Sequence, residues 1–152
     1  MDFQCEIKEQ ASQPTLSIRT RTPIDGLPRL LGDSYSRIAA YLAELGEEPA
    51  GAPFAAYYNM DMQDLDVEIG FPVAKPLHGK NDIRASEVPG GNLGYALYTG
   101  RYADIAPAYD ALTQFVQEQG YEPTGVSYEF YLNDPEETPQ EKLQTQIIFP
   151  LK

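Results

Sequence analysis

Glu129 is the second residue of the aromatic segment YEFY, residues 128–131. Aromatic residues at this density are typical of a β-strand, and such a strand packs against other apolar groups. A carboxylate on a packed surface is poorly stabilised unless a hydrogen-bond donor or a cation pairs with it. Two interpretations are open. Either Glu129 faces water on the outside of a sheet, or it lies in an aromatic groove that receives a cationic partner.

The charge of the chain limits its partners. The 152 residues include 11 basic and 23 acidic residues, which gives a net charge of −12. A surface this acidic repels phosphate backbones, so we expect no direct binding to nucleic acid. The single cysteine, Cys5, excludes an internal disulfide and predicts a reducing, cytoplasmic location. The sequence has no signal-peptide pattern and no apolar run long enough to span a membrane.

Metal and cofactor chemistry are not expected. His78 stands alone in a predicted loop, and the acidic run Asp134, Glu136, Glu137 and Glu141 is interrupted by prolines. That composition is typical of a solvated hairpin tip rather than a calcium loop. The sequence also lacks a Gly-rich phosphate loop.

The elements that would position Glu129 occur twice along the chain. Residues 45–73 and 119–151 each run from a glycine and a proline through an aromatic strand and an acidic turn to a strand that ends in Phe-Pro. A helical pattern and, before it, an alternating strand precede each copy. Gly46 and Gly120 are predicted to end the two helices. Residues 24–32, which contain Pro28 and Gly32, are predicted to form a separate short helical turn.

The predicted fold class is α+β. Two strand-helix-strand-strand units form one antiparallel sheet, with both helices on one face and a ligand groove on the other. Residues 1–13 are an N-terminal extension and residues 14–152 a single domain. Its pseudo-repeats cover about 14–73 and 92–151, joined by a linker at 74–91 that includes a short strand near its end.

Alternation along the strands assigns side chains to the two faces. Ile69 and Phe71 in one copy, and Ile147 and Phe149 in the other, are predicted to lie under the helices. Residues out of phase with them face the groove. Tyr128 and Phe130 are then assigned to the core by elimination. The predicted groove residues are Glu129, Tyr131, Tyr57, Glu68, Gln146 and Tyr98.

A groove of tyrosines around a carboxylate suits a cation with an apolar body, because cation–π contacts and the carboxylate both attract it. An open sheet face also carries Glu, Gln and Tyr without any ligand, so the water-facing interpretation stays open. Arg19 offers a way to neutralise one of these carboxylates.

The chain resembles the GyrI-like small-molecule-binding domain, which also forms the effector-binding half of AraC- and MerR-type multidrug-sensing regulators. The resemblance rests on GAPFAAYYNMDMQDLDVEIGFPV, on VPGGNLGYALYTGRYADIAPAYDALTQFVQEQG and on SYEFYLNDP with TQIIFPL. It extends from about Pro14 to Leu151 and implies a groove for amphipathic, cationic and aromatic compounds. Glu129 takes the position of the family's ligand-contacting glutamate. Tyr98 stands where the family often has a histidine, and Phe115 stands where a tryptophan is common in the family.

Three functions are consistent with this resemblance. The first is a stand-alone protein that senses or sequesters cationic small molecules, because the predicted domain leaves no room for a helix-turn-helix. The second is a hydrolase that opens strained rings of reactive genotoxins, with Glu129 or Glu68 as general base. The third is a protein-interaction module that acts on a topoisomerase or a regulator. We expect a binder rather than an enzyme, and the sequence names no protein partner.

Overall fold

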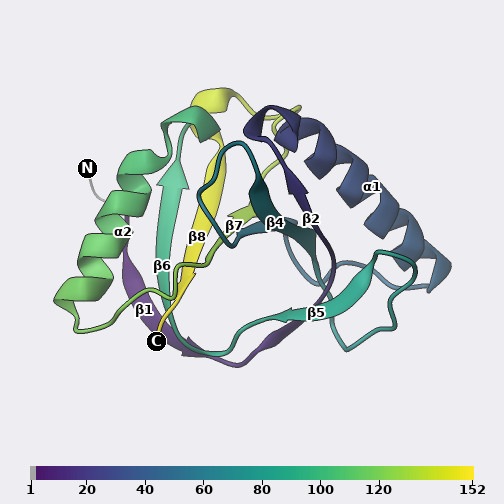
Figure 1. Cartoon of the computed structure of the whole chain (residues 1–152), viewed down its shortest axis with the longest axis horizontal. Coiled ribbons are helices and arrows are strands. Elements are labelled where there is room, and N and C mark those ends of the chain that lie inside the picture. The colour runs from purple at the N-terminus through teal and green to yellow at the C-terminus, as the bar shows by residue number, and fades with distance from the viewer. Residues whose placement is uncertain (1–2) are drawn as a thin grey trace. The chain divides into compact units, whose positions relative to one another are not determined.

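The computed structural model describes residues 3–152, which divide into two compact halves. The N-terminal half comprises residues 12–89, and the C-terminal half comprises residues 3–11 with residues 90–152. Each half contains four strands and one long helix (Figure 1). In chain order the elements are β1 (Glu6–Gln10), β2 (Gln13–Thr22), η1 (Ile24–Gly26), α1 (Leu27–Glu44), β3 (Phe54–Tyr57), β4 (Leu65–Pro72), β5 (Arg84–Val88), β6 (Gly91–Thr99), η2 (Tyr102–Asp104), α2 (Ala106–Glu118), β7 (Ser127–Tyr131), η3 (Gln140–Lys142) and β8 (Gln144–Pro150).

The N-terminal half orders its strands β3-β4-β2-β5, all antiparallel. Ile18 of β2 lies directly opposite Ile69 of β4. The buried face of α1 places Ile38 and Leu42 against Ile18 and Leu16. The alternation of apolar residues in β2 and β4 therefore matches the face that this helix covers.

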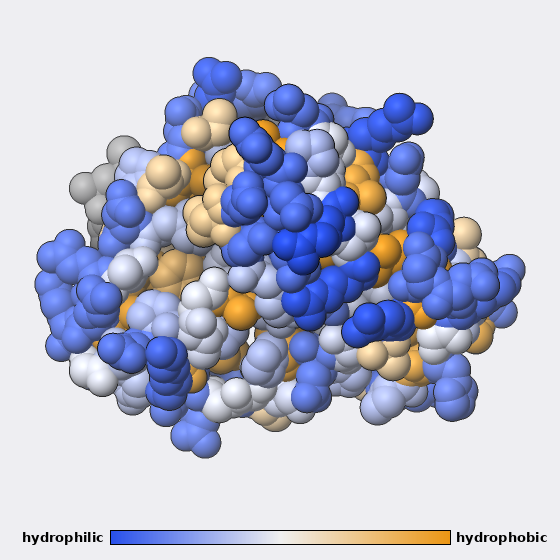
Figure 2. Space-filling view, viewed as in Figure 1, coloured by the Kyte–Doolittle hydropathy of each residue, from blue (hydrophilic) through white to orange (hydrophobic). Residues whose placement is uncertain are grey.

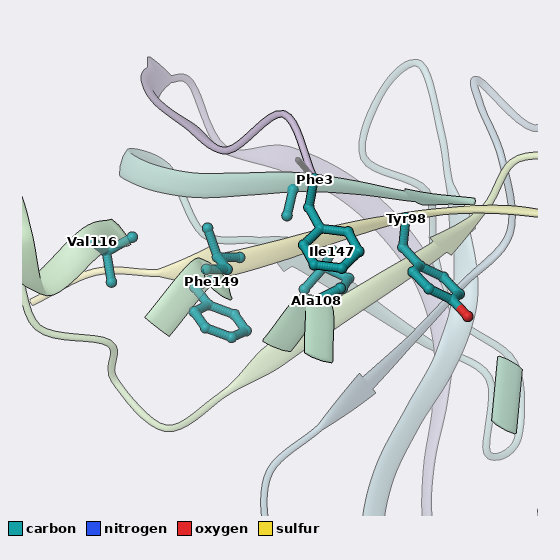
Figure 3. Close-up of a cluster of buried hydrophobic side chains, with 8 residues drawn as sticks. Phe3, Tyr98, Ala108, Val116, Ile147 and Phe149 are labelled. Atoms are coloured by element: carbon teal, nitrogen blue, oxygen red, sulfur yellow. The ribbon is translucent and has the colours of Figure 1, made fainter. Parts of the chain in front are cut away.

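The C-terminal half orders its strands β1-β6-β8-β7, again all antiparallel. Leu112 and Val116 of α2 pack with Ala96 of β6 and Ile147 of β8 in one buried cluster. Figure 3 shows this cluster, with Val116 at one end and Tyr98 at the other. The helix lies close to β6, because a side chain at Gly94 would meet Val116 Cγ1 at 2.8 Å.

The two helices end as the sequence predicts, but α1 begins earlier. Gly46 and Gly120 follow the helices with φ of +70° and +88°, the left-handed conformation that glycine adopts without strain. The prediction of a separate turn at residues 24–32 is wrong, because α1 starts at Leu27 and runs through Gly32. Pro28 lies in the first turn of α1, where its missing N–H costs no hydrogen bond.

Two edge strands lie outside the predicted repeats. β5 falls inside the predicted linker, close to the short strand expected there. β1 falls inside the predicted N-terminal extension and pairs with β6, with Ile7 opposite Gly94. Four of the five residues of β1 are exposed, which explains why its alternation carries no clear apolar signal.

The predicted fold class is confirmed: the chain is α+β, with antiparallel strands and a helix against the strands of each duplicated unit. The face in Figure 2 is mostly hydrophilic, with apolar residues scattered between polar ones. No helix within residues 3–152 is long and apolar enough to cross a membrane.

Candidate ligand-binding site

Glu129 accepts hydrogen bonds from two tyrosines of the C-terminal half. The Tyr131 hydroxyl, two residues along β7, donates to Glu129 Oε1 at 2.9 Å. The Tyr109 hydroxyl, from the first turns of α2, donates to Glu129 Oε2. Phenol donors to a carboxylate form charge-assisted hydrogen bonds, which are stronger than neutral ones. Glu129 is partly buried, and each oxygen of its carboxylate has a hydrogen-bond donor.

The strand register places Glu129 on the face that α2 covers. Glu129 lies directly opposite Ile147, which lies opposite Ala96, and Ile147 and Ala96 belong to the cluster under α2. Tyr128 faces the other way, opposite Ile148, and is 2% exposed. The predicted faces of β7 are therefore wrong: Glu129 is on the helix side, and Tyr128 and Phe130 are on the reverse.

The physical reason for this reversal lies on α2. If hydrophobicity alone decided the two faces, the more apolar side chains of YEFY would lie under the helix. Instead α2 presents a tyrosine at that point, so its phenol satisfies the carboxylate. The reverse face buries Tyr128 and Ile148 as well, so apolar character does not distinguish the two faces of β7.

Burial dominates the electrostatics of this carboxylate. Burial raises the pKa of Glu129 above its usual value of 4.5, and the hydrogen bonds from Tyr109 and Tyr131 oppose that rise. Within residues 3–152, no lysine, arginine or histidine forms an ion pair with Glu129. Glu129 is thus a partly buried carboxylate with hydrogen-bond donors but no cation.

Aromatic rings surround this carboxylate. The ring of Tyr102, from η2, lies 5.5 Å from the ring of Tyr131 at an angle of 60°. The ring of Tyr109 stacks on Phe149 with centroids 5.7 Å apart. Burial and the nearby charge of Glu129 both raise the pKa of Tyr102, which remains 37% exposed. The cluster therefore combines negative charge with several aromatic faces.

Tyr98 shares the helix side with Glu129 but lies deeper. It is 5% exposed, and its hydroxyl donates to the Arg101 carbonyl at 2.7 Å. Its ring packs against Phe3 with centroids 6.3 Å apart (Figure 3). Tyr98 is therefore part of the core beneath the cluster.

Gln146 faces the other way. It lies opposite Phe130 and Leu97, on the side away from α2, and its Nε2 donates to the Ala96 carbonyl at 3.0 Å. The structure therefore brings Glu129, Tyr131 and Tyr98 to one face of the C-terminal half and places Gln146 on the reverse.

Glu68 forms a separate carboxylate site in the N-terminal half. It is 5% exposed, and the hydroxyls of Ser17 and Tyr58 each donate to one of its oxygens at 2.5 Å. It lies opposite Arg19 and Ala56, on the face away from α1. Tyr57 lies opposite Val67, which places it on the face that α1 covers. The two predicted groove residues of this half are therefore on opposite faces.

Arg19 pairs with Asp66 and not with either predicted groove carboxylate, Glu129 or Glu68. Its guanidinium binds Asp66 through two hydrogen bonds, of 3.0 and 2.8 Å, and holds the pKa of Asp66 below its usual value. The same guanidinium lies 3.8 Å from the ring centroid of Tyr58. Tyr58 thus contacts the Arg19 guanidinium through its ring and Glu68 through its hydroxyl.

Several residues of these sites are absent from the sequence prediction: Tyr109, Tyr102, Ser17 and Tyr58. Tyr109 carries a usable signal, because a tyrosine in the apolar stripe of a helix needs a partner for its hydroxyl. Tyr102 and Tyr58 have no comparable signal. Residues 3–152 contain no group of three or more His, Cys, Asp or Glu side chains that could hold a metal ion.

Comparison with known proteins agrees with this architecture. A family model described as GyrI-like small molecule binding domain matches residues 3–152. No curated protein sequence matches the chain.

Solved structures with the same fold have low sequence identity. A chain of the EcmrR–DNA complex is 21% identical with a TM-score of 0.82, and the match covers 98% of this chain and 57% of that one. The isolated EcmrR C-terminal domain is 19% identical with a TM-score of 0.79, and the match covers 100% and 99%.

Two further structures are similar over most of their length. A hydrolase from Listeria innocua is 14% identical, has a TM-score of 0.70 and is matched over 99% of this chain and 93% of that one. SAV2435, bound to tetraphenylphosphonium, is 13% identical, has a TM-score of 0.64 and is matched over 98% and 94%. At these identities the structures show a common fold. Together with the family model over residues 3–152, they lead to one conclusion: the chain belongs to the GyrI-like small-molecule-binding domain family.

Proposed function

We propose that this chain binds cationic aromatic or amphipathic small molecules, with Glu129 as the charge anchor. The observation that carries the proposal is a partly buried carboxylate that has two phenol donors and no ion-pair partner within residues 3–152. A cation that reaches Glu129 would supply the missing charge. Its binding would also favour the ionised carboxylate, which burial alone disfavours.

The aromatic rings around Glu129 support the same class of ligand. Tyr102 is 37% exposed beside Tyr131, so its ring is available to a flat or bulky cation. A cation over a tyrosine face gains about 0.5–2 kcal/mol. Tyr131 and Tyr109 would hold the carboxylate in place while the ligand binds.

The wider comparison points in the same direction. SAV2435 has the same fold and was solved with tetraphenylphosphonium, a bulky aromatic cation. EcmrR places this fold within a DNA complex, and the chain spans 57% of that protein's length. We therefore propose that capture of such cations serves multidrug-type sensing or sequestration. Tyr57, Glu68, Gln146 and Tyr98 remain predictions as ligand contacts.

The test is isothermal titration with tetraphenylphosphonium and with neutral triphenylphosphine oxide. We expect the native chain to prefer the cation and Glu129→Gln to lose most of that preference. Glu118→Gln is a matched control, because Glu118 is an exposed residue of α2 and the substitution removes the same charge. Equal cation affinity for the native chain and Glu129→Gln would contradict the proposal.

A second candidate is hydrolysis of a strained ring. A carboxylate whose pKa is raised by burial is a better general base, and the L. innocua hydrolase shares the fold. With an epoxide, water would attack a ring carbon while Glu129 takes its proton. The C–O bond would break, and the alkoxide would then take the proton back from Glu129, which gives a diol and restores the carboxylate.

Styrene oxide separates this candidate from reversible binding. An enzyme forms phenylethanediol with time and loses that activity in Glu129→Gln. A binder shows saturation without turnover. Diol formation at the uncatalysed rate would exclude hydrolysis of this substrate.

A further inference from the structure

Thr145 carries a buried hydroxyl without a hydrogen-bond partner. The residue is 0% exposed, and within residues 3–152 its Oγ1 neither donates nor accepts a hydrogen bond. A threonine hydroxyl can donate one hydrogen bond and accept two. Buried polar atoms are nearly always paired, so an unpaired one calls for an explanation, and a polar group from outside the chain is one.

Thr145 lies on the strand face that carries the Glu129 cluster, which consists of Glu129, Tyr102, Tyr109 and Tyr131. On β8 it is directly opposite Tyr131 of β7 and Tyr98 of β6. The next row on the same face contains Glu129, opposite Ile147. Diagonal neighbours of this kind have side chains roughly 7–8 Å apart. A ligand anchored on Glu129 therefore needs only a short polar arm to reach the hydroxyl.

We propose that Thr145 is a hydrogen-bonding subsite that selects cationic ligands carrying an oxygen or nitrogen atom a few bonds from the positive centre. This inference rests on the proposed function, because it assumes that a cation occupies Glu129. Since Thr145 has no exposed surface, a neighbouring ring must turn aside to admit the ligand. Tyr102 is the most exposed ring of the cluster, at 37%, and exposed side chains change rotamer within nanoseconds.

The chain offers a matched control for this position. Thr15, in the N-terminal half, is 1% exposed and also has an unpaired Oγ1. Valine has nearly the shape of threonine, so Thr145→Val and Thr15→Val each remove one buried hydroxyl and leave no cavity. If neither hydroxyl contacts a ligand, Thr145→Val and Thr15→Val will have the same effect on ligand affinity.

Two isosteric probes test the subsite: (3-hydroxypropyl)triphenylphosphonium and butyltriphenylphosphonium. They have the same charge and number of heavy atoms and differ in one terminal group, a hydroxyl or a methyl. Affinities are measured by isothermal titration on the native chain, Thr145→Val and Thr15→Val. The readout is the ratio of the two affinities within each protein, so general changes in binding cancel.

We expect the ratio to favour the hydroxyl probe in the native chain and in Thr15→Val, and to fall about 2- to 10-fold in Thr145→Val. A ratio unchanged by Thr145→Val, with both probes bound, overturns the subsite and leaves the proposed function standing. A fall of equal size in Thr15→Val also overturns it. If neither probe binds the native chain, the proposed function fails and the subsite fails with it.

Discussion

Tyr109 donates its phenol hydrogen to the carboxylate of Glu129, so a helix residue and a strand residue 20 positions apart share one hydrogen bond. The same tyrosine ring stacks on Phe149 in the core of the C-terminal half. The bond therefore ties a polar group of the candidate site to the packing between α2 and β8. Perturbation of either residue should be measurable in both stability and binding.

Glu129 should make folding stability depend on pH. Its pKa is raised in the folded chain, so the folded state binds its proton more tightly than the unfolded state does. The corresponding stabilisation is complete below the usual pKa of 4.5 and is lost as pH rises through the raised pKa. Each unit of difference between the two pKa values is worth about 1.4 kcal/mol.

Glu129→Gln isolates this contribution from the other acidic residues. We expect the variant to gain stability relative to the native chain as pH rises from about 4.5 towards 8, because glutamine stays neutral. Urea unfolding at a series of pH values measures the difference. A difference that stays constant with pH would mean that the Glu129 pKa is not raised.

Tyr109→Phe should raise the pKa of Glu129 further, because it removes a hydrogen bond that favours the ionised carboxylate and keeps the ring on Phe149. At pH values above the pKa of Glu129, we expect the variant to lose about 1.5–3 kcal/mol in the free energy of unfolding. This is the usual range for a hydrogen bond to a charged group. NMR titration of the Glu129 carboxyl carbon gives the pKa directly.

Tyr95→Phe is the control for that experiment. Tyr95 lies opposite Ile148, on the face of β6 away from Glu129. The Tyr95→Phe substitution should therefore leave the titration of Glu129 unchanged. If both variants shift the titration equally, the Tyr109 hydroxyl has no specific role.

Ser17→Ala should destabilise the N-terminal half. It removes one of two hydroxyl donors to Glu68, a carboxylate that is 5% exposed, and leaves an oxygen without its partner. The expected loss is about 1–3 kcal/mol in the free energy of unfolding. Ser86→Ala, on the adjacent strand β5, should change stability by less than about 0.5 kcal/mol. Equal losses in chemical denaturation would show that the bond to Glu68 contributes nothing.

Alanine substitutions at Gly94 and Gly32 should have opposite effects on the stability of the chain. At Gly94 a new Cβ would meet Val116 Cγ1 at 2.8 Å, so Gly94→Ala should cost about 1–3 kcal/mol through overpacking. At Gly32, inside α1, nothing lies within 4 Å of the added carbon, so Gly32→Ala should stabilise the chain by up to about 1 kcal/mol. Thermal unfolding of the two variants gives the sign. Destabilisation by both would mean that α1 does not tolerate a longer side chain at Gly32.

The local pattern of the sequence determined the duplicated units, the apolar stripes of both helices and the glycines that end them. These features depend on residues close in the chain, because a stripe repeats every three or four residues and a C-terminal glycine acts within one turn. The sequence also identified Glu129 as the anomalous residue of its strand, since a carboxylate among aromatic residues needs a partner.

Only the tertiary structure decided which face Glu129 occupies and which groups it meets. A shift of one residue in strand pairing reverses every side chain, and the segment YEFY has apolar residues that suit either face. The pairing of Glu129 with Ile147, the hydrogen bond from Tyr109 and the position of Thr145 between Tyr98 and Tyr131 all join residues distant in the chain. Such contacts follow from strand register and helix packing, which no local pattern specifies.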